Sequence, residues 1–171
     1  MKTIGLVLET ARLRLRELID ADLDFVAGML GDPEVARYYE KTFTRDDAWD
    51  WLRRQQARYA RDGHGLWLAV ERETEAPVGQ VGLVLQEVEG QMLPEIGWLL
   101  DRPFWGHGYA SEAAAATREA AFGRWRYPAV ISLIRPVNER SRRVAERIGM
   151  KPGRLVAFHG YEHIVYGAAA P

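Results

Sequence analysis

The sequence predicts one domain of the α+β class, in which helices cover both faces of a single mixed sheet. Stretches with an apolar residue at every second position, typical of strands, alternate with stretches of helical periodicity. Their order is β-α-α-β-β-β-α-β-α-β-β, which corresponds to a sheet of about seven strands. A chain of 171 residues also favours a single hydrophobic core. We therefore expect one domain that spans residues 1–171.

The N-terminal third is expected to form one strand and two helices. Residues 12–18 (RLRLREL) alternate between charged and apolar side chains over most of their length and predict a half-buried strand. A helix follows over residues 20–31, where Asp20 is a plausible N-cap and a glycine ends the pattern. The second helix covers residues 44–63, and acidic residues in its first turn favour that start.

From residue 65 onward the apolar period changes to two. Residues 65–72, 76–89 and 93–101 predict three adjacent strands. The remaining segments predict, in order, a helix over 109–124, a strand over 129–134, a helix over 141–148 and two strands within 154–168 that meet at Gly160.

Composition excludes several classes of function. The chain has no cysteine, which excludes disulfides, thiolate metal sites and a cysteine nucleophile. A formal net charge of −1 provides no basic field for nucleic acid or for an anionic membrane. The sequence contains neither a long apolar run nor the apolar core of a signal peptide. We therefore expect a cytoplasmic protein without a nucleic-acid or membrane partner.

The stretch RPFWGHGYASEA, residues 102–113, joins a predicted strand to a predicted helix. Gly106 and Gly108 can both adopt positive φ, which turns backbone N–H groups toward one point. The first amides of the following helix are unpaired and carry a partial positive charge, so the turn is suited to an anion. The same glycines would also suit a tight turn that binds no ligand. The pattern matches neither the dinucleotide-binding fingerprint nor the Walker loop of nucleotide-binding proteins.

A second motif follows the strand predicted at 129–134. Asn138 lies three residues before Ser141 at the start of a helix, and on its own this spacing indicates only an N-cap. Together with the glycine turn, however, the motif resembles the GNAT superfamily of acyl-CoA N-acyltransferases, in particular its RimJ/RimL-like branch. The blocks that carry the resemblance, in order and spacing, are residues 8–39, 94–113 and 138–153.

The resemblance implies a twisted, mostly antiparallel sheet and acetyl-CoA as co-substrate. The superfamily signature Gln/Arg-x-x-Gly-x-Gly/Ala falls on residues 105–110, where Gly108 and Ala110 match and Trp105 replaces Gln/Arg. Backbone amides of this segment are then expected to hold the pyrophosphate. The implied cofactor-binding residues are Trp98, Leu99 and Leu100 on the pantetheine arm, Trp105, Gly106, His107, Gly108, Tyr109 and Ala110 on the pyrophosphate, Asn138 on the arm, Ser141 near the thioester sulfur, and Arg143 or Arg142 on the 3′-phosphate.

In the absence of a cysteine, the simplest mechanism is direct attack of an amine on the bound thioester in a ternary complex. We favour Glu95 as the base over Glu87 and Glu40. The N–H of Leu99 or Leu100 is expected to polarise the carbonyl, with Leu100 preferred. The tyrosine acid common in the superfamily is absent here, because Ala145 occupies its position; Ser141 is the substitute, and solvent is the alternative.

Several other polar and aromatic residues have a structural interpretation beside a functional one. His159 and His163 straddle a predicted hairpin turn, so we expect no metal site. Glu112 suits the first turn of a helix without any further role, and the imidazole of His107 is expected either near a phosphate or in solvent. Five aromatic residues are candidates for an acceptor pocket or for the core: Tyr38, Tyr39, Trp49, Trp51 and Trp67.

The function expected from the resemblance is acetyl transfer to a primary amine, either a protein N-terminus or a small amine or amino acid. Two other classes stay open. The absent tyrosine favours a non-catalytic acyl-CoA-binding module, and the glycine turn alone is also compatible with an interaction domain that binds no CoA. A homodimer is expected from the branch alone.

Overall fold

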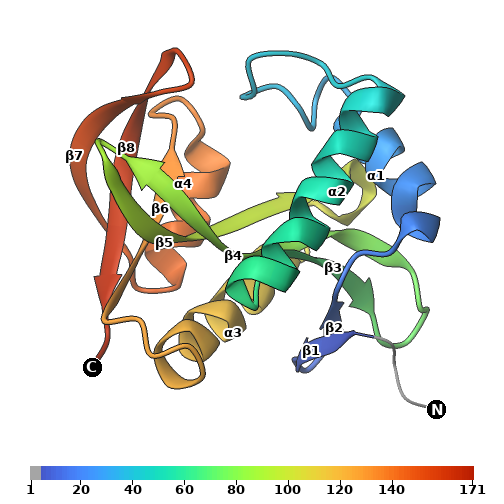
Figure 1. Ribbon diagram of the computed structural model, residues 1–171, viewed down its shortest axis with the longest axis horizontal. Helices are drawn as coiled ribbons and strands as arrows, with labels where there is room; N and C mark the ends of the chain where they lie inside the picture. Colours follow the sequence, from blue (N-terminus) through green and yellow to red (C-terminus); the bar gives the residue numbers. More distant parts are fainter. Residues whose placement is uncertain (1–4) are drawn as a thin grey trace.

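The computed structural model describes residues 5–171, which form one eight-stranded sheet flanked by helices (Figure 1). The elements are β1 (Leu6–Glu9), β2 (Leu13–Arg16), α1 (Leu23–Leu30), α2 (Arg45–Asp62), β3 (Leu66–Glu71), β4 (Pro77–Val88), β5 (Gln91–Leu100), α3 (Tyr109–Gly123), β6 (Ala129–Ile134), α4 (Glu139–Arg147), β7 (Lys151–Phe158) and β8 (Tyr161–Ala169).

The strand order is β1-β2-β3-β4-β5-β6-β8-β7, and every neighbouring pair is antiparallel except β5 and β6. This confirms the mixed α/β fold and the mostly antiparallel sheet. The expected count of about seven strands was one too low, because β1 was not predicted. β1 is a four-residue edge strand that pairs with β2 across an irregularity in register, so it has too few residues to show a clear alternation.

Helices cover both faces of the sheet, as the alternation along β3 demonstrates. Trp67 and Ala69 are fully buried in the cluster that contains the inward residues of α3 and α4. Leu68 and Val70 lie in the opposite cluster, with apolar residues of α1 and α2. The alanine-rich sequence of α3 lets this helix pack closely on the sheet: Ala113, Ala114 and Ala121 are all fully buried.

The sheet opens between its only two parallel neighbours. Ten residue pairs join β4 to β5, whereas β5 and β6 share one registered pair, Glu95 with Ile131. Beyond that pair the two strands diverge. In Figure 1, β6, β7, β8 and α4 lie to the left of the opening, and β1, β2 and β3 lie to its right. No helix within residues 5–171 has the length and apolarity required to cross a bilayer.

Candidate active site

The second half of β5 presents an unpaired backbone edge to this opening. The Ser132 hydroxyl donates to the Ile96 carbonyl at 2.8 Å, so the polar groups of Ile96 face β6. Because successive residues of a strand point their polar groups to alternate edges, those of Trp98 and Leu100 face the same way. The Leu99 carbonyl instead lies against Gly79 of β4. Of residues 98–100, only Trp98 and Leu100 can therefore offer backbone groups to a ligand in the opening, and the Leu100 carbonyl already accepts from Nε1 of Trp105 at 2.9 Å.

The glycine turn follows directly at the end of β5. Gly106 and Gly108 have φ of 81° and 79°, as expected for a turn that aims its amides inward. Gly108 is the N-cap of α3, and no side chain caps this helix. The first amides of α3 are consequently available to an anion, and the partial positive charge of the helix terminus favours one.

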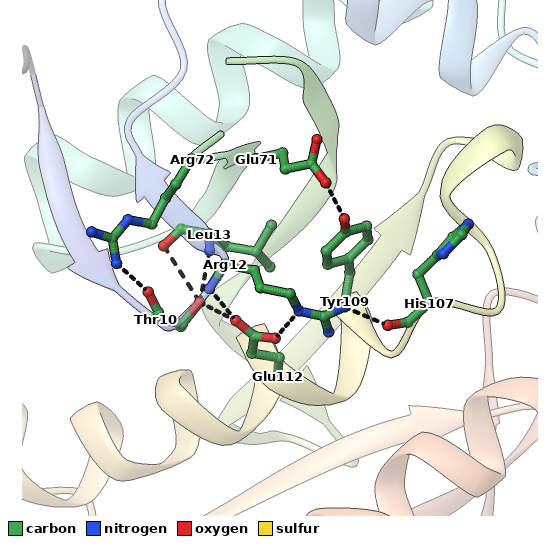
Figure 2. A network of polar contacts seen from close by, with 8 residues as sticks. All are labelled: Thr10, Arg12, Leu13, Glu71, Arg72, His107, Tyr109 and Glu112. Carbon is green, nitrogen blue, oxygen red and sulfur yellow. Dashed lines mark hydrogen bonds and ion pairs between the residues drawn. The ribbon is translucent and has the colours of Figure 1, made fainter. Parts of the chain in front are cut away.

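A network of polar contacts fixes this turn to the N-terminal hairpin (Figure 2). Arg12 donates from Nη1 to the His107 carbonyl at 2.9 Å and from Nε to Glu112 at 2.7 Å. Its guanidinium also lies 4.4 Å from the centroid of the Tyr109 ring. The Thr10 hydroxyl donates to Glu112 at 2.6 Å. Glu112, which would be favourable in a first turn by itself, therefore ties α3 to the segment that precedes β2.

The turn borders a cavity of about 550 Å³ at the side of the opening nearest α3 and α4. All predicted cofactor-binding residues line it except His107, whose carbonyl accepts from Arg12. Arg142 also lies outside it, because its side chain bonds to Tyr166 and to the Pro136 carbonyl. The lining residues named from the sequence are Trp98, Leu99, Leu100, Trp105, Gly106, Gly108, Tyr109, Ala110, Asn138, Ser141 and Arg143.

Three basic residues of this cavity were missed by sequence reasoning, namely Arg37, which follows α1, and two residues of α4. Arg140 and Arg147 line the cavity together with Arg143, all from α4. The guanidinium of Arg140 stacks 3.9 Å from the centroid of the Trp105 ring. Arg140, Arg143 and Arg147 are three and four residues apart, so they lie on one face of the helix. This spacing in the segment NERSRRVAER could have predicted the basic face.

A second cavity of about 570 Å³ lies on the other side of the opening, between α2, β5, β6 and the β7–β8 hairpin. Trp98, Leu99, Asn138 and Ser141 line both cavities, so the two spaces adjoin at these residues. Three of the predicted aromatic residues border the second cavity, namely Tyr38, Tyr39 and Trp51.

The other two aromatic candidates belong to the interior instead. Trp67 is fully buried and stacks on Trp125 with ring centroids 5.7 Å apart. Trp49 packs against the cluster beneath α1 and α2 and carries Arg53 over its ring at 4.5 Å. Their position in the core follows the ordinary behaviour of large aromatic side chains.

Glu95 lies within the second cavity, beside the only registered β5–β6 pair. Its carboxylate accepts from the Leu133 N–H at 2.9 Å and from the Gln86 amide at 3.3 Å. Burial raises the pKa of Glu95 to about 7, and these two hydrogen bonds oppose the rise. A carboxyl group with this pKa can accept a proton near neutrality.

The two weaker candidates for the base have different positions. Glu87 is exposed and lines neither cavity. Glu40 lies at the second cavity with its carboxylate 3.6 Å from the His159 ring, and both side chains are more than half exposed. Within residues 5–171 there is no group of three His, Asp or Glu side chains arranged to hold a metal.

Ser141 lies where the two cavities adjoin. Its hydroxyl accepts from Nε1 of Trp98 at 3.2 Å, and its backbone N–H donates to Oδ1 of Asn138 at 3.2 Å. The N-cap interpretation of Asn138 is thus correct, and Nδ2 is the atom left for a ligand. Because the serine oxygen accepts from Trp98, its own proton is free to be donated. Ala145 is fully buried, so its position contributes no acid.

A sheet that opens between two parallel strands and continues into a glycine turn at a helix N-terminus defines the class of acyl-CoA-dependent acetyltransferases. Comparison with known proteins is in agreement. The family model described as acetyltransferase (GNAT) domain matches residues 12–151. The chain therefore belongs to the GNAT family and contains an acetyltransferase domain.

Individual relatives support the same assignment. The uncharacterized protein YkkB of Bacillus subtilis (strain 168) is 38% identical over 150 residues, which cover 87% of each chain. The crystal structure of an acetyltransferase from Agrobacterium tumefaciens str. C58 superimposes with a TM-score of 0.84 at 30% identity, covering 95% of this chain and 94% of that one. RimL, a ribosomal L7/L12 α-N-protein acetyltransferase determined in complex with coenzyme A, shares the fold with a TM-score of 0.79 at 14% identity, over 96% of this chain and 97% of that one.

Proposed function

We propose that this protein transfers the acetyl group of acetyl-CoA to a primary amine by direct attack in a ternary complex. The observation that carries the proposal is the pair of cavities that adjoin at Trp98 and Ser141. One contains an anion-binding turn and a basic helix face, and the other contains a carboxyl group with a pKa of about 7. The acceptor is a protein N-terminus or a small amine or amino acid.

The first cavity is suited to the cofactor in three places. Amides of residues 106–110 hold the pyrophosphate, since the two glycines adopt positive φ and have no side chain in the way. The Trp105 N–H is not available, because it donates to the Arg102 carbonyl at 3.2 Å. The backbone groups of Trp98 and the N–H of Leu100 pair with the pantetheine arm, since the Leu100 carbonyl already accepts from Trp105, and Asn138 contacts the arm through Nδ2. Arg143, with its neighbours on the same face of α4, provides positive charge for the 3′-phosphate.

The chemical step needs a base, an oxyanion donor and a proton for the leaving thiolate. Glu95 takes the proton from the incoming ammonium, directly or through water, and the amine nitrogen then forms the new C–N bond. The N–H of Leu100 donates to the developing oxyanion, because that of Leu99 faces β4. As the C–S bond breaks, the acylated nitrogen loses its second proton and the thiolate receives one from Ser141 or from solvent; where Ser141 donates, the proton released by the nitrogen restores its hydroxyl, directly or through water.

The test combines two measurements on the intact protein. Free CoA at 100 times its dissociation constant is expected to stabilise the folded state by about 2.7 kcal/mol, seen as a rise in Tm. Release of CoA thiol from acetyl-CoA is then measured across a panel of amines and peptides. A Tm rise without thiol release supports the non-catalytic binding module, whereas no rise at millimolar CoA supports an interaction domain and contradicts the proposal.

The other expectations from the sequence stay predictions. These are the cytoplasmic location, the homodimer, and a reaction without a metal, nucleic acid or membrane partner.

A further inference from the structure

One face of α2 forms a wall of the second cavity and places an arginine deep within it. Asp47, Trp51, Gln55 and Arg58 recur at helical spacing and all line the cavity. Arg58 is half-buried, unlike Arg54, which is exposed on the same helix. The interior of the acceptor side therefore contains a fixed positive charge.

No carboxylate within residues 5–171 forms an ion pair with Arg58, although Glu95 and Asp62 act on its charge at longer range. No Asp or Glu oxygen of that range lies within 4.0 Å of the Arg58 guanidinium, which donates from Nη1 to Gln55 Oε1 at 3.2 Å. Burial lowers the pKa of Arg58, as expected for a cation removed from water. Arg16, another half-buried arginine, is bound by both carboxylate oxygens of Asp22 at 2.8 Å. A partly buried cation without a counterion is costly, and a ligand that provides one would be strongly attracted.

Gln55 holds the guanidinium in place. It is fully buried, and its Oε1 also accepts from the Leu66 N–H at 3.1 Å, which connects the side chain to β3. Its Nε2 has no hydrogen-bond partner within the described residues. Gln55 is therefore positioned to orient Arg58 rather than to neutralise it.

The remaining charged groups at this cavity are paired, stacked or exposed, Glu95 excepted. Lys41 pairs with Asp47 at 2.7 Å, and the guanidinium of Arg135 lies 4.0 Å from the centroid of the Tyr161 ring. Glu40 pairs with His159 at the rim, while Asp50 and Arg54 are exposed. His163 bonds through Nδ1 to the Tyr161 carbonyl. Glu95 and Arg58 are thus the two opposite charges that face the interior at separate points without forming an ion pair.

We propose that the amine acceptor is a small molecule that also carries an oxyanion, a carboxylate or a phosphate. The oxyanion binds the Arg58 guanidinium, whose planar N–H groups match two acceptor oxygens, while the amine faces Glu95. A cavity of about 570 Å³ is of the size that encloses small ligands. This inference rests on the acetyl transfer proposed above, because it takes the second cavity as the site where the amine enters.

The experiment uses pairs of amines that differ only in the anionic group. Amino acids are compared with their amides, and phosphoethanolamine with ethanolamine, in the release of CoA thiol from acetyl-CoA. We expect kcat/KM to be at least ~10-fold higher for the anionic member, because charge-assisted hydrogen bonds of this kind contribute about 1.5–3 kcal/mol. The pair with the larger ratio of kcat/KM, carboxylate or phosphate, identifies the oxyanion that Arg58 binds. A peptide N-terminus that exceeds every small acid would contradict the small-molecule assignment.

Arg58→Gln is expected to reduce the ratio within each pair to about 1. The ratios are measured well above pH 7, because Arg58 lowers the pKa of Glu95 and its removal alone would slow the reaction of every amine near pH 7. Arg58→Lys, which keeps the charge but not the planar fork, should retain part of the preference. Arg53→Gln is the matched control, because Arg53 lies on the same helix, stacks on Trp49 and lines neither cavity. Equal losses for both members of a pair, or the same loss in the control, would overturn the proposal.

Calorimetric titration of the amines into the CoA complex provides a readout that does not depend on turnover. If anionic amines bind in an Arg58-dependent way but no amine releases thiol, the proposed transfer fails and the oxyanion site stands. If thiol is released without any preference for anionic amines, the transfer stands and the oxyanion site fails. If no anionic amine binds or reacts, the oxyanion site is refuted, whatever the outcome for neutral amines.

Discussion

The two cavities are built in different ways, although they share Trp98 and Ser141. The phosphate-binding part of the donor side is backbone from one continuous stretch, the end of β5 and the turn before α3, and side chains of α4 and of the segment after α1 complete the cavity. The acceptor side consists of side chains from α2, β5, β6 and the β7–β8 hairpin, which are distant in sequence. The binding capacity of the first depends on main-chain geometry, and that of the second depends on which residues occupy those positions. A substitution that alters a backbone angle on the donor side should therefore change the affinity for CoA. A substitution that alters one charge on the acceptor side should change kcat/KM instead.

The largest effect is expected from Gly108→Val on the donor side. A β-branched residue is strained at φ 79°, and its Cβ would lie 3.5 Å from Nη2 of Arg12, so relief of the strain displaces the turn and the helix amides that face the cavity. We expect the affinity for CoA to fall at least ~100-fold, with a stability cost of about 1–2 kcal/mol. Calorimetry with CoA and denaturant unfolding measure the two quantities.

Gly90→Val is the matched control for strain. Gly90 has φ 80°, a Cβ added there would meet no other atom within 4 Å, and the residue lies in the β4–β5 turn away from both cavities. The variant should lose similar stability and keep its affinity for CoA. If both variants lose affinity for CoA to the same extent, the turn at Gly108 has no specific role in binding CoA.

On the acceptor side, Glu95→Gln is expected to lower kcat/KM by ~10²–10⁴ while leaving CoA affinity unchanged. In the wild type, kcat/KM should rise as the pH passes through about 7, because the base must be deprotonated. The variant should lose this limb of the profile. A wild-type profile that is flat around pH 7, or a variant with full activity, would exclude Glu95 as the base.

The same substitution changes stability in a predictable direction. The pKa of Glu95 is raised by burial from 4.5 to about 7, so between those values the native state binds more protons than the unfolded state. Wild-type stability therefore falls as the pH rises through this window. Glutamine cannot ionise, so Glu95→Gln should gain stability relative to the wild type between pH 5 and pH 8. Urea unfolding at both pH values measures this, and a relative loss would contradict the assigned shift.

The same difference between the two sides explains what the sequence could predict. The elements around the turn were predicted closely because glycine, N-cap and alternation signals are local. The α3 helix, for example, was predicted over 109–124 and spans Tyr109–Gly123. The four-residue strand β1 was missed because it is defined by pairing to β2 rather than by its own pattern.

Side chains that converge from distant elements were beyond sequence reasoning. Trp49 and Trp51 are equivalent in the sequence and both pack against the cluster beneath α1 and α2, yet only Trp51 also borders the acceptor cavity. Arg58 shows no signal among the other arginines of α2, because its significance lies in the absence of a carboxylate in space. His107 falls on a position of the family signature that any residue can occupy; it does not line the cavity, and its carbonyl accepts from Arg12.

The smallest effect is expected from Arg12→Ala, which loosens the attachment of the donor turn without altering its residues. Arg12 is 45% exposed at its side chain, so its ion pair with Glu112 is worth at most about 1 kcal/mol. We expect KM for acetyl-CoA to rise up to ~5-fold with kcat unchanged, because the turn holds the cofactor and Glu95 does the chemistry. Arg14→Ala is the control: Arg14 lies two residues after Arg12, in β2, pairs with Glu9 and Glu75, away from the turn, and should leave KM unaltered. An equal rise in KM for both variants, or a fall in kcat for Arg12→Ala alone, would show that the network in Figure 2 does not act through the position of the turn.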